Sequence, residues 1–241
     1  MPPIRSWLPA PPTVRATPGV VHVWRADLGA MANDGLSDLL CAEERERAVR
    51  ILGERNRALW LRSRGVLRAL LGRYLDRDPH ELRFELAQHG KPALREGTGS
   101  ALGLRFNLSH SGELMLVAVT AGREVGVDIE CVRRDHARSP IDEPAIAARM
   151  LGLEQARRLE GLDPETRKAE FLRAWTMREA TVKCLGTGLV SAASPSEDDT
   201  STEVWTAELD GGPRAIAAVV VQGSEACELR CWDSAPTLTP R

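Results

Sequence analysis

One short segment restricts the fold more than any other, because its two faces differ in chemistry. Residues 125–130 read Val-Gly-Val-Asp-Ile-Glu. This alternation is the period of a β-strand, so the three aliphatic side chains point to one face and Asp128 and Glu130 point to the other. We expect a strand with one face on a hydrophobic core and the other face turned toward a polar site.

A second segment, residues 175–183, reads Trp-Thr-Met-Arg-Glu-Ala-Thr-Val-Lys. It lies on a predicted helix with Asp163 as N-cap, Pro164 at the first helical position and Gly186 as the stop. Glu179 and Lys183 are four residues apart and therefore share a helix face. Together the two segments offer three carboxylates and a lysine, which are the groups that hold a hard divalent cation beside a phosphate.

Composition narrows the class of protein. The chain has 241 residues, 43% of them hydrophobic and 27% charged, which suits one or two domains that bury roughly 70 to 75% of the unfolded surface. The formal net charge of −2 disfavours bulk nucleic-acid binding. There is neither a membrane-length apolar run nor an apolar signal-peptide core, so we expect a cytoplasmic protein without a membrane partner. The five cysteines are scattered and are expected to be reduced thiols.

The pattern along the chain predicts an α+β protein in two similar halves. Residues 1–18 are a proline-rich arm, residues 19–124 the N-terminal half and residues 125–241 the C-terminal half, which holds the acidic motifs. Two long helical segments are expected between residues 38 and 75, a shorter helix at 145–151, a charged linker at 133–144 and a polar loop at 192–201. Residues 121–123 are expected to turn two strands into a hairpin. The predicted strands are residues 20–26, 82–86, 104–108, 114–120, 124–129, 203–209, 215–222 and 228–232.

The basic residues are strongly biased toward arginine. All but three of the 32 basic residues are arginines, and the lysines are Lys91, Lys168 and Lys183. A chain with this bias keeps lysine where a compact ammonium group is needed, or by chance. Two of the three lysines lie in candidate motifs.

Each candidate side chain also has a purely structural interpretation. Asp128 and Glu130 suit an exposed strand face, Arg178 suits simple solvent exposure, and Lys183 suits an i,i+4 salt bridge with Glu179 that is worth a few tenths of a kcal/mol. Glu179 is the hardest to explain in this way, because it borders an apolar stripe on its helix and an acid in that place needs a partner.

Further motifs narrow the choice when they are taken together. Residues 106–112 read Phe-Asn-Leu-Ser-His-Ser-Gly, and residues 90–92 read Gly-Lys-Pro. With these motifs in this order, the sequence resembles the 4′-phosphopantetheinyl transferases that modify carrier proteins of polyketide, nonribosomal-peptide, lysine and fatty-acid pathways. The resemblance runs from about residue 20 to about residue 221, and its motifs are residues 43–47, 90–92, 107–111, 126–130, 175–183 and 186–189.

The resemblance implies a fold and a reaction. The fold would be two α+β halves in a pseudo-twofold arrangement with the active site at their interface, in a monomer that resembles a dimer. The reaction would move the 4′-phosphopantetheine arm of coenzyme A to a serine of an apo acyl or peptidyl carrier protein. It would depend on Mg²⁺, with Mn²⁺ as the alternative cation, and would release adenosine 3′,5′-bisphosphate. The enzyme would be a holo-[acyl-carrier-protein] synthase.

The resemblance also implies roles for named residues. The metal ligands would be Asp128, Glu130 and Glu179, and the catalytic residues Asp128, Glu179 and Lys183. The coenzyme would contact Arg47, Gly90, Lys91, Pro92, Asn107, Ser109, His110, Arg178 and Lys183. The base that takes the serine proton stays open between Glu179, Lys183 and a metal-bound water held by Glu130. Some relatives use a further glutamate near Glu154 or Gln155, and neither is assigned that role.

Two positions depart from the family pattern. Arg178 stands where many relatives have lysine, which keeps the charge and changes the donor geometry. Glu44 stands where some members are basic, so the 3′-phosphate would depend on Arg47 together with a neighbour such as Arg50 or Arg64.

Four other interpretations compete with this one. A serine hydrolase using Ser109, His110 and Asp128 lacks a Gly-x-Ser-x-Gly elbow, and adjacent strand residues point to opposite faces. A metal-dependent phosphohydrolase acting on coenzyme A or a nucleotide would use the same acids and is the stronger rival. A non-catalytic binding module would be expected to have lost an acid. Zinc at Cys227 and Cys231 lacks a second ligand pair.

Overall fold

The computed structural model describes residues 7–31, 35–87, 90–95, 103–132, 144–187, 203–212 and 215–233. Four predicted features fall wholly or partly outside these residues. They are the start of the proline-rich arm, almost all of the linker at 133–144, the second half of the motif at 186–189 and the polar loop at 192–201.

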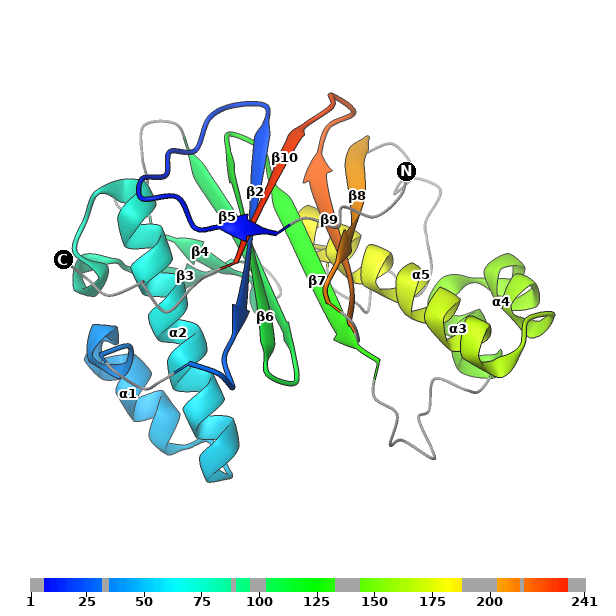
Figure 1. Cartoon of the computed structure of the whole chain (residues 1–241), viewed down its shortest axis with the longest axis horizontal. Coiled ribbons are helices and arrows are strands. Elements are labelled where there is room, and N and C mark those ends of the chain that lie inside the picture. Colours follow the sequence, from blue (N-terminus) through cyan, green and yellow to red (C-terminus); the bar gives the residue numbers. More distant parts are fainter. Residues whose placement is uncertain are drawn as a thin grey trace.

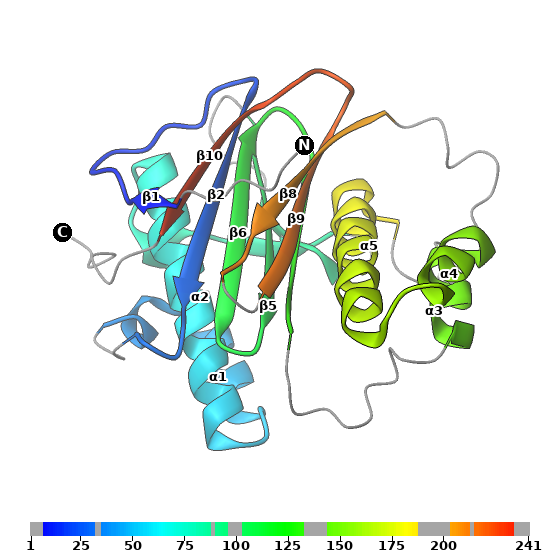
Figure 2. The same cartoon turned by 45° about the vertical axis from the view of Figure 1, so that its right-hand side comes forward.

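The described chain forms four layers, with two sheets face to face and a long helix on the outer side of each (Figures 1 and 2). The first sheet has the strand order β1-β10-β2-β6-β5, the second has the order β7-β9-β8, and β3 and β4 form a small hairpin. These strands are β1 (Leu8–Pro9), β2 (Val20–Asp27), β3 (Phe84–Leu86), β4 (Pro92–Leu94), β5 (Leu104–Ser111), β6 (Leu114–Ala121), β7 (Val125–Cys131), β8 (Val204–Asp210), β9 (Ala215–Gln222) and β10 (Glu228–Asp233). The prediction of an α+β protein is confirmed.

The helices are distributed between the two sides of the molecule. On one side lie α1 (Ala42–Val49) and α2 (Glu54–Leu75), with the 3₁₀ turns η1 (Ser37–Leu39) and η2 (Pro79–Glu81). On the other side lie α3 (Pro144–Leu151), α4 (Leu153–Glu160) and α5 (Pro164–Leu185). None of these helices combines the length and the apolar composition needed to cross a membrane.

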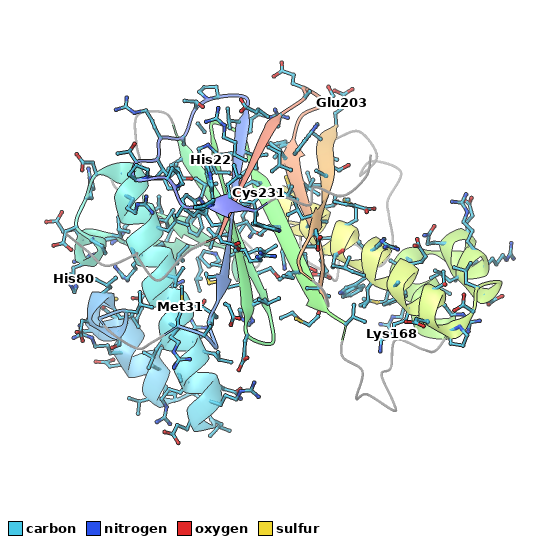
Figure 3. The ribbon with its side chains drawn as sticks, in the orientation of Figure 1. His22, Met31, His80, Lys168, Glu203 and Cys231 are labelled. Carbon is cyan, nitrogen blue, oxygen red and sulfur yellow. The ribbon has the colours of Figure 1, made fainter. Side chains whose placement is uncertain are left out.

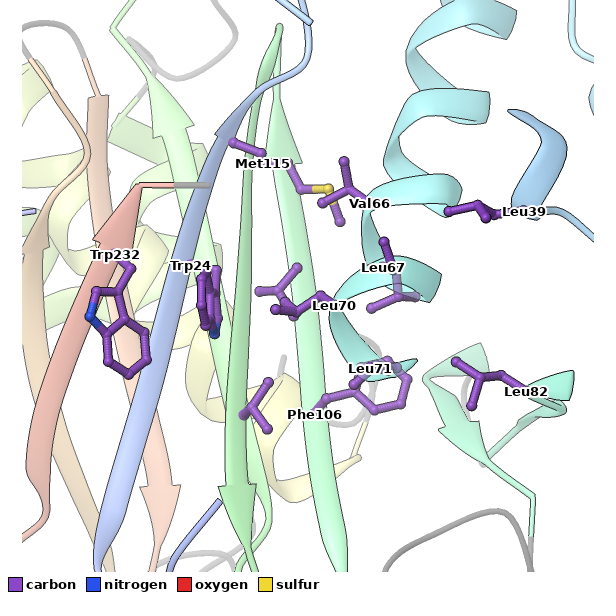
Figure 4. Close-up of a cluster of buried hydrophobic side chains, with 14 of the residues drawn as sticks. Trp24, Leu39, Val66, Leu67, Leu70, Leu71, Leu82, Phe106, Met115 and Trp232 are labelled. Carbon is purple, nitrogen blue, oxygen red and sulfur yellow. The ribbon is translucent and has the colours of Figure 1, made fainter. Parts of the chain in front are cut away.

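The largest core lies between α2 and the first sheet (Figure 4). Val66, Leu67 and Leu70 of α2 pack against Trp24 of β2 and Met115 of β6, and all five side chains are at most 1% exposed. Burying a side chain of this size contributes about 1.5 to 3 kcal/mol. This apolar face is why the arginine-rich α2 folds against the sheet although its other face is charged.

A second core lies between the two sheets and uses the alternation predicted from the sequence. Val125, Val127 and Ile129 of β7 point inward and meet Val23 of β2 and Leu116 of β6. The opposite face of β7 is left for Gly126, Asp128 and Glu130, as the period of a strand requires.

The boundaries of α5 follow the signals in its sequence. The side chain of Asp163 accepts hydrogen bonds from the amides of Glu165 and Thr166, and Pro164 occupies the first turn. At the other end Gly186 adopts φ 68°, a left-handed conformation that suits glycine. The predicted N-cap and stop are confirmed.

The predicted hairpin of residues 114–120 and 124–129 is wrong. β6 pairs with β2 and β5, whereas β7 pairs with β9 in the other sheet. The three residues after β6 therefore carry the chain from one sheet to the other. Their turn-like composition was read correctly, but the apolar faces of the two strands stack across the inter-sheet core instead of pairing side by side.

β10 also departs from the simple division of the chain at residue 124. Its residues 228–233 pair in parallel with β2 and with β1, so the last described strand lies in the first sheet. Two smaller differences concern lengths. The first expected long helix is the short α1, and the strand expected at 82–86 begins only at Phe84, after the 3₁₀ turn η2.

Candidate active site

A close contact between α5 and β7 brings the two predicted motifs together. A Cβ on Gly126 would lie only 1.9 Å from the carbonyl oxygen of Ala180 and 2.5 Å from the amide nitrogen of Cys184. No side chain larger than a hydrogen fits there, so the helix backbone rests directly on the strand. Glu179 and Lys183, which flank this contact on α5, are thereby placed beside Asp128, two residues along β7.

Asp128 is the centre of the site. Its side chain is 5% exposed, and its Oδ1 atom accepts hydrogen bonds from Lys183 Nζ at 2.5 Å and from Ser109 Oγ at 2.8 Å. Lys183 Nζ also donates to Ser109 Oγ at 3.1 Å. The structure thus joins residues from β5, β7 and α5, and Lys183 forms its ion pair across the interface with Asp128.

Two carboxylate oxygens of the site are buried without a hydrogen-bond partner. They are Asp128 Oδ2 and Glu179 Oε1. A buried carboxylate oxygen without a donor is costly unless a cation or a proton satisfies it. After Lys183 has paired with Asp128, these two oxygens can still bind a further positive group.

The oxygen atoms of the site decide whether a metal ion can bind there. The described residues contain no ready-made cluster of three His, Cys, Asp or Glu side chains around one point. Mg²⁺, however, usually takes only one or two protein carboxylates and completes its octahedron with water and substrate phosphates. Asp128 Oδ2 and Glu179 Oε1 fit such an open site.

Burial changes the proton affinity of two of the acids. The pKa of Glu179 is raised, chiefly by burial and further by the negative charges of Asp128 and Glu130, while Lys183 and Arg178 oppose the shift. The pKa of Glu130 is also raised, again chiefly by burial, while hydrogen bonds from Ser111 and Trp175 oppose the shift. Both acids would be stabilised as carboxylates by an added cation.

Side chains of β5 hold the strand that carries the acids. Asn107 Oδ1 accepts a hydrogen bond from the amide of Val127 at 2.9 Å, and Ser111 Oγ donates to Glu130 Oε2 at 2.9 Å. Asn107 thus contacts β7, while Ser111, which we had assigned no role, contacts an acid of the site. Its position two residues after Ser109 was the signal in the sequence, because alternate residues of a strand share a face.

The loop at residues 90–92 lies at the turn of the β3–β4 hairpin. Gly90 has φ 82°, and Lys91 Nζ donates to Glu124 Oε2 at 2.9 Å and to the carbonyl of Val125 at 3.0 Å. Arg105 Nε lies 2.8 Å from the other oxygen of Glu124. The structure therefore brings Lys91 to the start of β7, and Glu124 is a partner that we had not anticipated.

The remaining predicted coenzyme contacts lie on α1, β5 and α5. Arg47 is exposed on α1, with its guanidinium 5.9 Å from the ring centroid of Trp60. His110 is exposed on β5, and the alternation of the strand turns it away from Ser109. Arg178 is half-buried on α5, and Arg64 hydrogen-bonds Glu44, so Arg64 is engaged within the fold.

Comparison with known proteins gives two family matches. Residues 32–122 match the model described as "4′-phosphopantetheinyl transferase, N-terminal", and residues 124–226 match "4′-phosphopantetheinyl transferase superfamily". The two matched ranges together cover most of the described chain.

Individual relatives carry the same name. The chain is 33% identical to 4′-phosphopantetheinyl transferase HetI of Nostoc over 230 residues, which is 90% of this chain and 94% of that protein. It is 39% identical to AcpT of Salmonella typhi over 54% of this chain and 59% of the relative. It is 26% identical to Sfp of Bacillus subtilis over 65% of each chain. This chain belongs to the 4′-phosphopantetheinyl transferase family.

Proposed function

We propose that the protein transfers the 4′-phosphopantetheine arm of coenzyme A to a serine of an apo acyl or peptidyl carrier protein. One observation supports the chemistry most directly. In this chain of the phosphopantetheinyl transferase family, a buried aspartate paired with a lysine lies where β5, β7 and α5 meet, and one oxygen of this aspartate and one of Glu179 have no donor. A divalent cation on these two oxygens would, together with the lysine, neutralise a pyrophosphate.

The reaction exchanges one phosphorus–oxygen bond for another. The serine oxygen of the carrier forms a bond to the β-phosphorus, and the bond from this phosphorus to the bridging oxygen breaks. Adenosine 3′,5′-bisphosphate leaves with the electron pair, and the serine proton passes to a base. Because the attacked group is already anionic, positioning and charge neutralisation are the dominant catalytic effects.

The site residues would divide this work. Asp128 and Glu179 would hold Mg²⁺, with Mn²⁺ as the alternative cation and Glu130 as a third carboxylate beside them. Mg²⁺ would supply charge neutralisation of the pyrophosphate. Lys183, held by Asp128 and Ser109, would place its ammonium on the same phosphates.

Coenzyme A itself would contact both halves of the molecule. Arg47 would bind the 3′-phosphate, and the hairpin turn of Gly90, Lys91 and Pro92 would approach the coenzyme from the side of β7. Asn107, Ser109, His110 and Arg178 complete the proposed contacts. Lys91 would have to share or leave its ion pair with Glu124 to reach a phosphate.

The proton acceptor is proposed only as a choice between Glu179, Lys183 and a metal-bound water held by Glu130. Burial is the chief cause of the raised pKa of Glu179, and a higher pKa makes a carboxylate a stronger base, whereas Mg²⁺ on the same carboxylate would oppose the shift. Glu154 lies on α4 with an exposed ion pair to Arg158, so its contacts give it no part in the site. We further propose a cytoplasmic monomer with coenzyme A and carrier proteins as its partners.

The test is incubation with coenzyme A, Mg²⁺ and a panel of apo carrier proteins, followed by intact mass measurement. We expect one carrier or more to gain the phosphopantetheine mass, and a carrier whose target serine is replaced by alanine to gain none. The rival phosphohydrolase would release phosphopantetheine or phosphate without any carrier. Failure to modify every carrier of the panel would overturn the proposal.

A further inference from the structure

Alternate side chains of β5 reach across to β7. Asn107 accepts from the amide of Val127, Ser109 donates to Asp128, and Ser111 donates to Glu130. β7 has its main-chain ladder with β9 on its other edge. On the edge that faces β5, Asn107 takes the place of a main-chain partner for Val127, and the two serines bond to the side chains of the acids. Two serines two residues apart therefore hold two acids two residues apart.

The hydroxyl of Ser111 has a defined direction. Its oxygen accepts a hydrogen bond from the amide of Cys131 at 3.1 Å. An amide can only donate, so the hydroxyl proton is free to point elsewhere, and the acceptor within reach is Glu130 Oε2 at 2.9 Å. The main chain of β7 thus orients the serine, and the serine in turn orients the glutamate.

Glu130 needs such support more than Asp128 does. Its longer side chain has an additional rotatable bond, and fixing a rotamer-rich side chain costs conformational entropy. The Asp128 carboxylate is held by hydrogen bonds from Lys183 and Ser109. Glu130 accepts a hydrogen bond from the hydroxyl of Ser111.

We propose that Ser111 is a positioning residue that holds the Glu130 carboxylate for a divalent cation. The inference rests on the proposed function, because it assumes that the acids of the site bind the metal of the transfer reaction. Groups that orient a metal-binding carboxylate typically change metal affinity by 10- to 100-fold when they are removed. Ser111 thereby acts through Glu130.

Direct binding of Mn²⁺ to the full-length protein, followed by the electron paramagnetic resonance signal of the free ion, tests this role without an activity assay. Ser111→Ala should weaken Mn²⁺ binding by about tenfold. Ser111→Thr keeps the hydroxyl and should restore most of the affinity. Thermal unfolding of each variant confirms that the protein is folded when the metal is added.

Ser224 offers a matched control. Its hydroxyl also donates to a glutamate, with Ser224 Oγ 2.6 Å from Glu203 Oε2, and this pair is exposed. Figure 3 shows Glu203 at the upper end of the second sheet, beyond β8. Ser224→Ala removes a serine–glutamate hydrogen bond away from the acids and should leave Mn²⁺ affinity unchanged.

A double-mutant cycle separates the two bonds of Ser111. If the serine acts through Glu130, Ser111→Ala should cost about tenfold in the native background and almost nothing in a Glu130→Ala background. The same tenfold loss in both backgrounds would show that the lost acceptor for the Cys131 amide is responsible, and would overturn the proposal. An unchanged Mn²⁺ affinity in folded Ser111→Ala would overturn it as well.

The wild-type protein distinguishes failure of this inference from failure of the proposed function. Carrier modification by the wild type, together with an unaltered metal affinity in Ser111→Ala, refutes the role of Ser111 and leaves the function intact. Absence of carrier modification, with the cycle behaving as expected, refutes the function and leaves the positioning role. A wild type that binds no Mn²⁺ refutes the positioning role directly.

Discussion

Two clusters of buried charge lie on opposite sides of the molecule, and they differ in how completely they are paired. Between α1 and α2, Glu44 accepts from Arg64 at 2.6 Å on one oxygen and from Arg68 at 2.6 Å on the other. Between β7 and α5, Asp128 Oδ2 and Glu179 Oε1 lack any hydrogen-bond partner. The first cluster is complete in itself, whereas the second has acceptor capacity left over.

The pKa shifts of the two glutamates reflect this difference. Burial raises the pKa of Glu44, but the hydrogen bonds and charges of Arg68 and Arg64 outweigh it, so the net shift is downward. Burial also raises the pKa of Glu179, and there the nearby carboxylates add to the effect. A buried acid whose charge is already satisfied stabilises the fold, and one whose charge is unsatisfied is suited to bind a ligand.

Removing an acid from the incomplete cluster should have the largest effect, and chiefly on activity. Asp128→Ala or Glu179→Ala should lower the transfer rate by roughly a thousandfold or more, because charge neutralisation at the pyrophosphate is lost. Glu179→Gln should match the loss of activity while keeping the volume. Thermal unfolding of the Glu179 variants should stay close to the wild type, whereas Asp128→Ala also removes the carboxylate that pairs with Lys183 and should lower the unfolding temperature. Near-normal transfer in either alanine variant would show that the metal site is misplaced.

The same substitution in the complete cluster should act on stability. Glu44→Ala leaves Arg68, whose side chain is 1% exposed, as a buried guanidinium without its carboxylate, and should lower the free energy of unfolding by about 3 to 5 kcal/mol. Urea unfolding measures this loss, and the exposed Glu154→Ala serves as control. If Glu44→Ala were as stable as the wild type, the Glu44 cluster could not be said to stabilise the fold, and it would no longer differ in this respect from the Asp128 cluster.

A third buried polar group is His22, whose pKa can be compared with those of Glu44 and Glu179 because its side chain is buried in the neutral form. His22 of β2 (Figure 3) is 2% exposed, and burial, with a smaller contribution from Arg230, lowers its pKa from 6.5 to about 4. The unfolded chain therefore takes up the proton first as the pH falls. The contribution of His22 to stability is full above about pH 6.5 and declines toward pH 4.

The size of this effect can be measured with a variant. Between pH 7 and pH 5 the free energy of unfolding should fall by about 2 kcal/mol more in the wild type than in His22→Gln, since a shift of one pKa unit corresponds to about 1.4 kcal/mol. Urea unfolding at the two pH values gives the difference. Equal losses in both proteins would mean that His22 accepts a proton in the folded state.

The smallest effect is expected at an exposed charge. Arg47→Ala should raise the apparent KM for coenzyme A by about tenfold with little change in kcat, because the arginine would bind the 3′-phosphate and not the reacting group. The effect should weaken at high salt. Arg45→Ala, on the same helix, is the control. An unchanged KM would remove Arg47 from the coenzyme site.

Local patterns in the sequence were sufficient for most individual elements. The alternation in β7 and the caps of α5 depend on neighbouring residues, so both could be predicted and both are confirmed. The hairpin prediction was wrong because strand pairing depends on partners distant in sequence. β7 pairs with β9, and β10 pairs with β2 in the first sheet.

The candidate site shows the same limit. Asp128, Glu179 and Lys183 were selected by residue type and spacing, and the structure brings Asp128 and Lys183 into contact. The support of Glu130 by Ser111 and the ion pair of Lys91 with Glu124 were not foreseen. Each joins residues from segments distant in sequence, and no local period encodes such a contact.

The sequence by itself therefore determined which side chains share a face of each strand or helix, because the periods of these elements are set by backbone geometry. It also carried the family motifs in their order. Only the tertiary structure decided which faces meet. The absence of a Cβ at Gly126 lets α5 rest on β7, and packing of the two sheets brings β5 alongside. Burial and unpaired oxygens arise from those contacts, and they distinguish the acids of the site from the acids that only stabilise the fold.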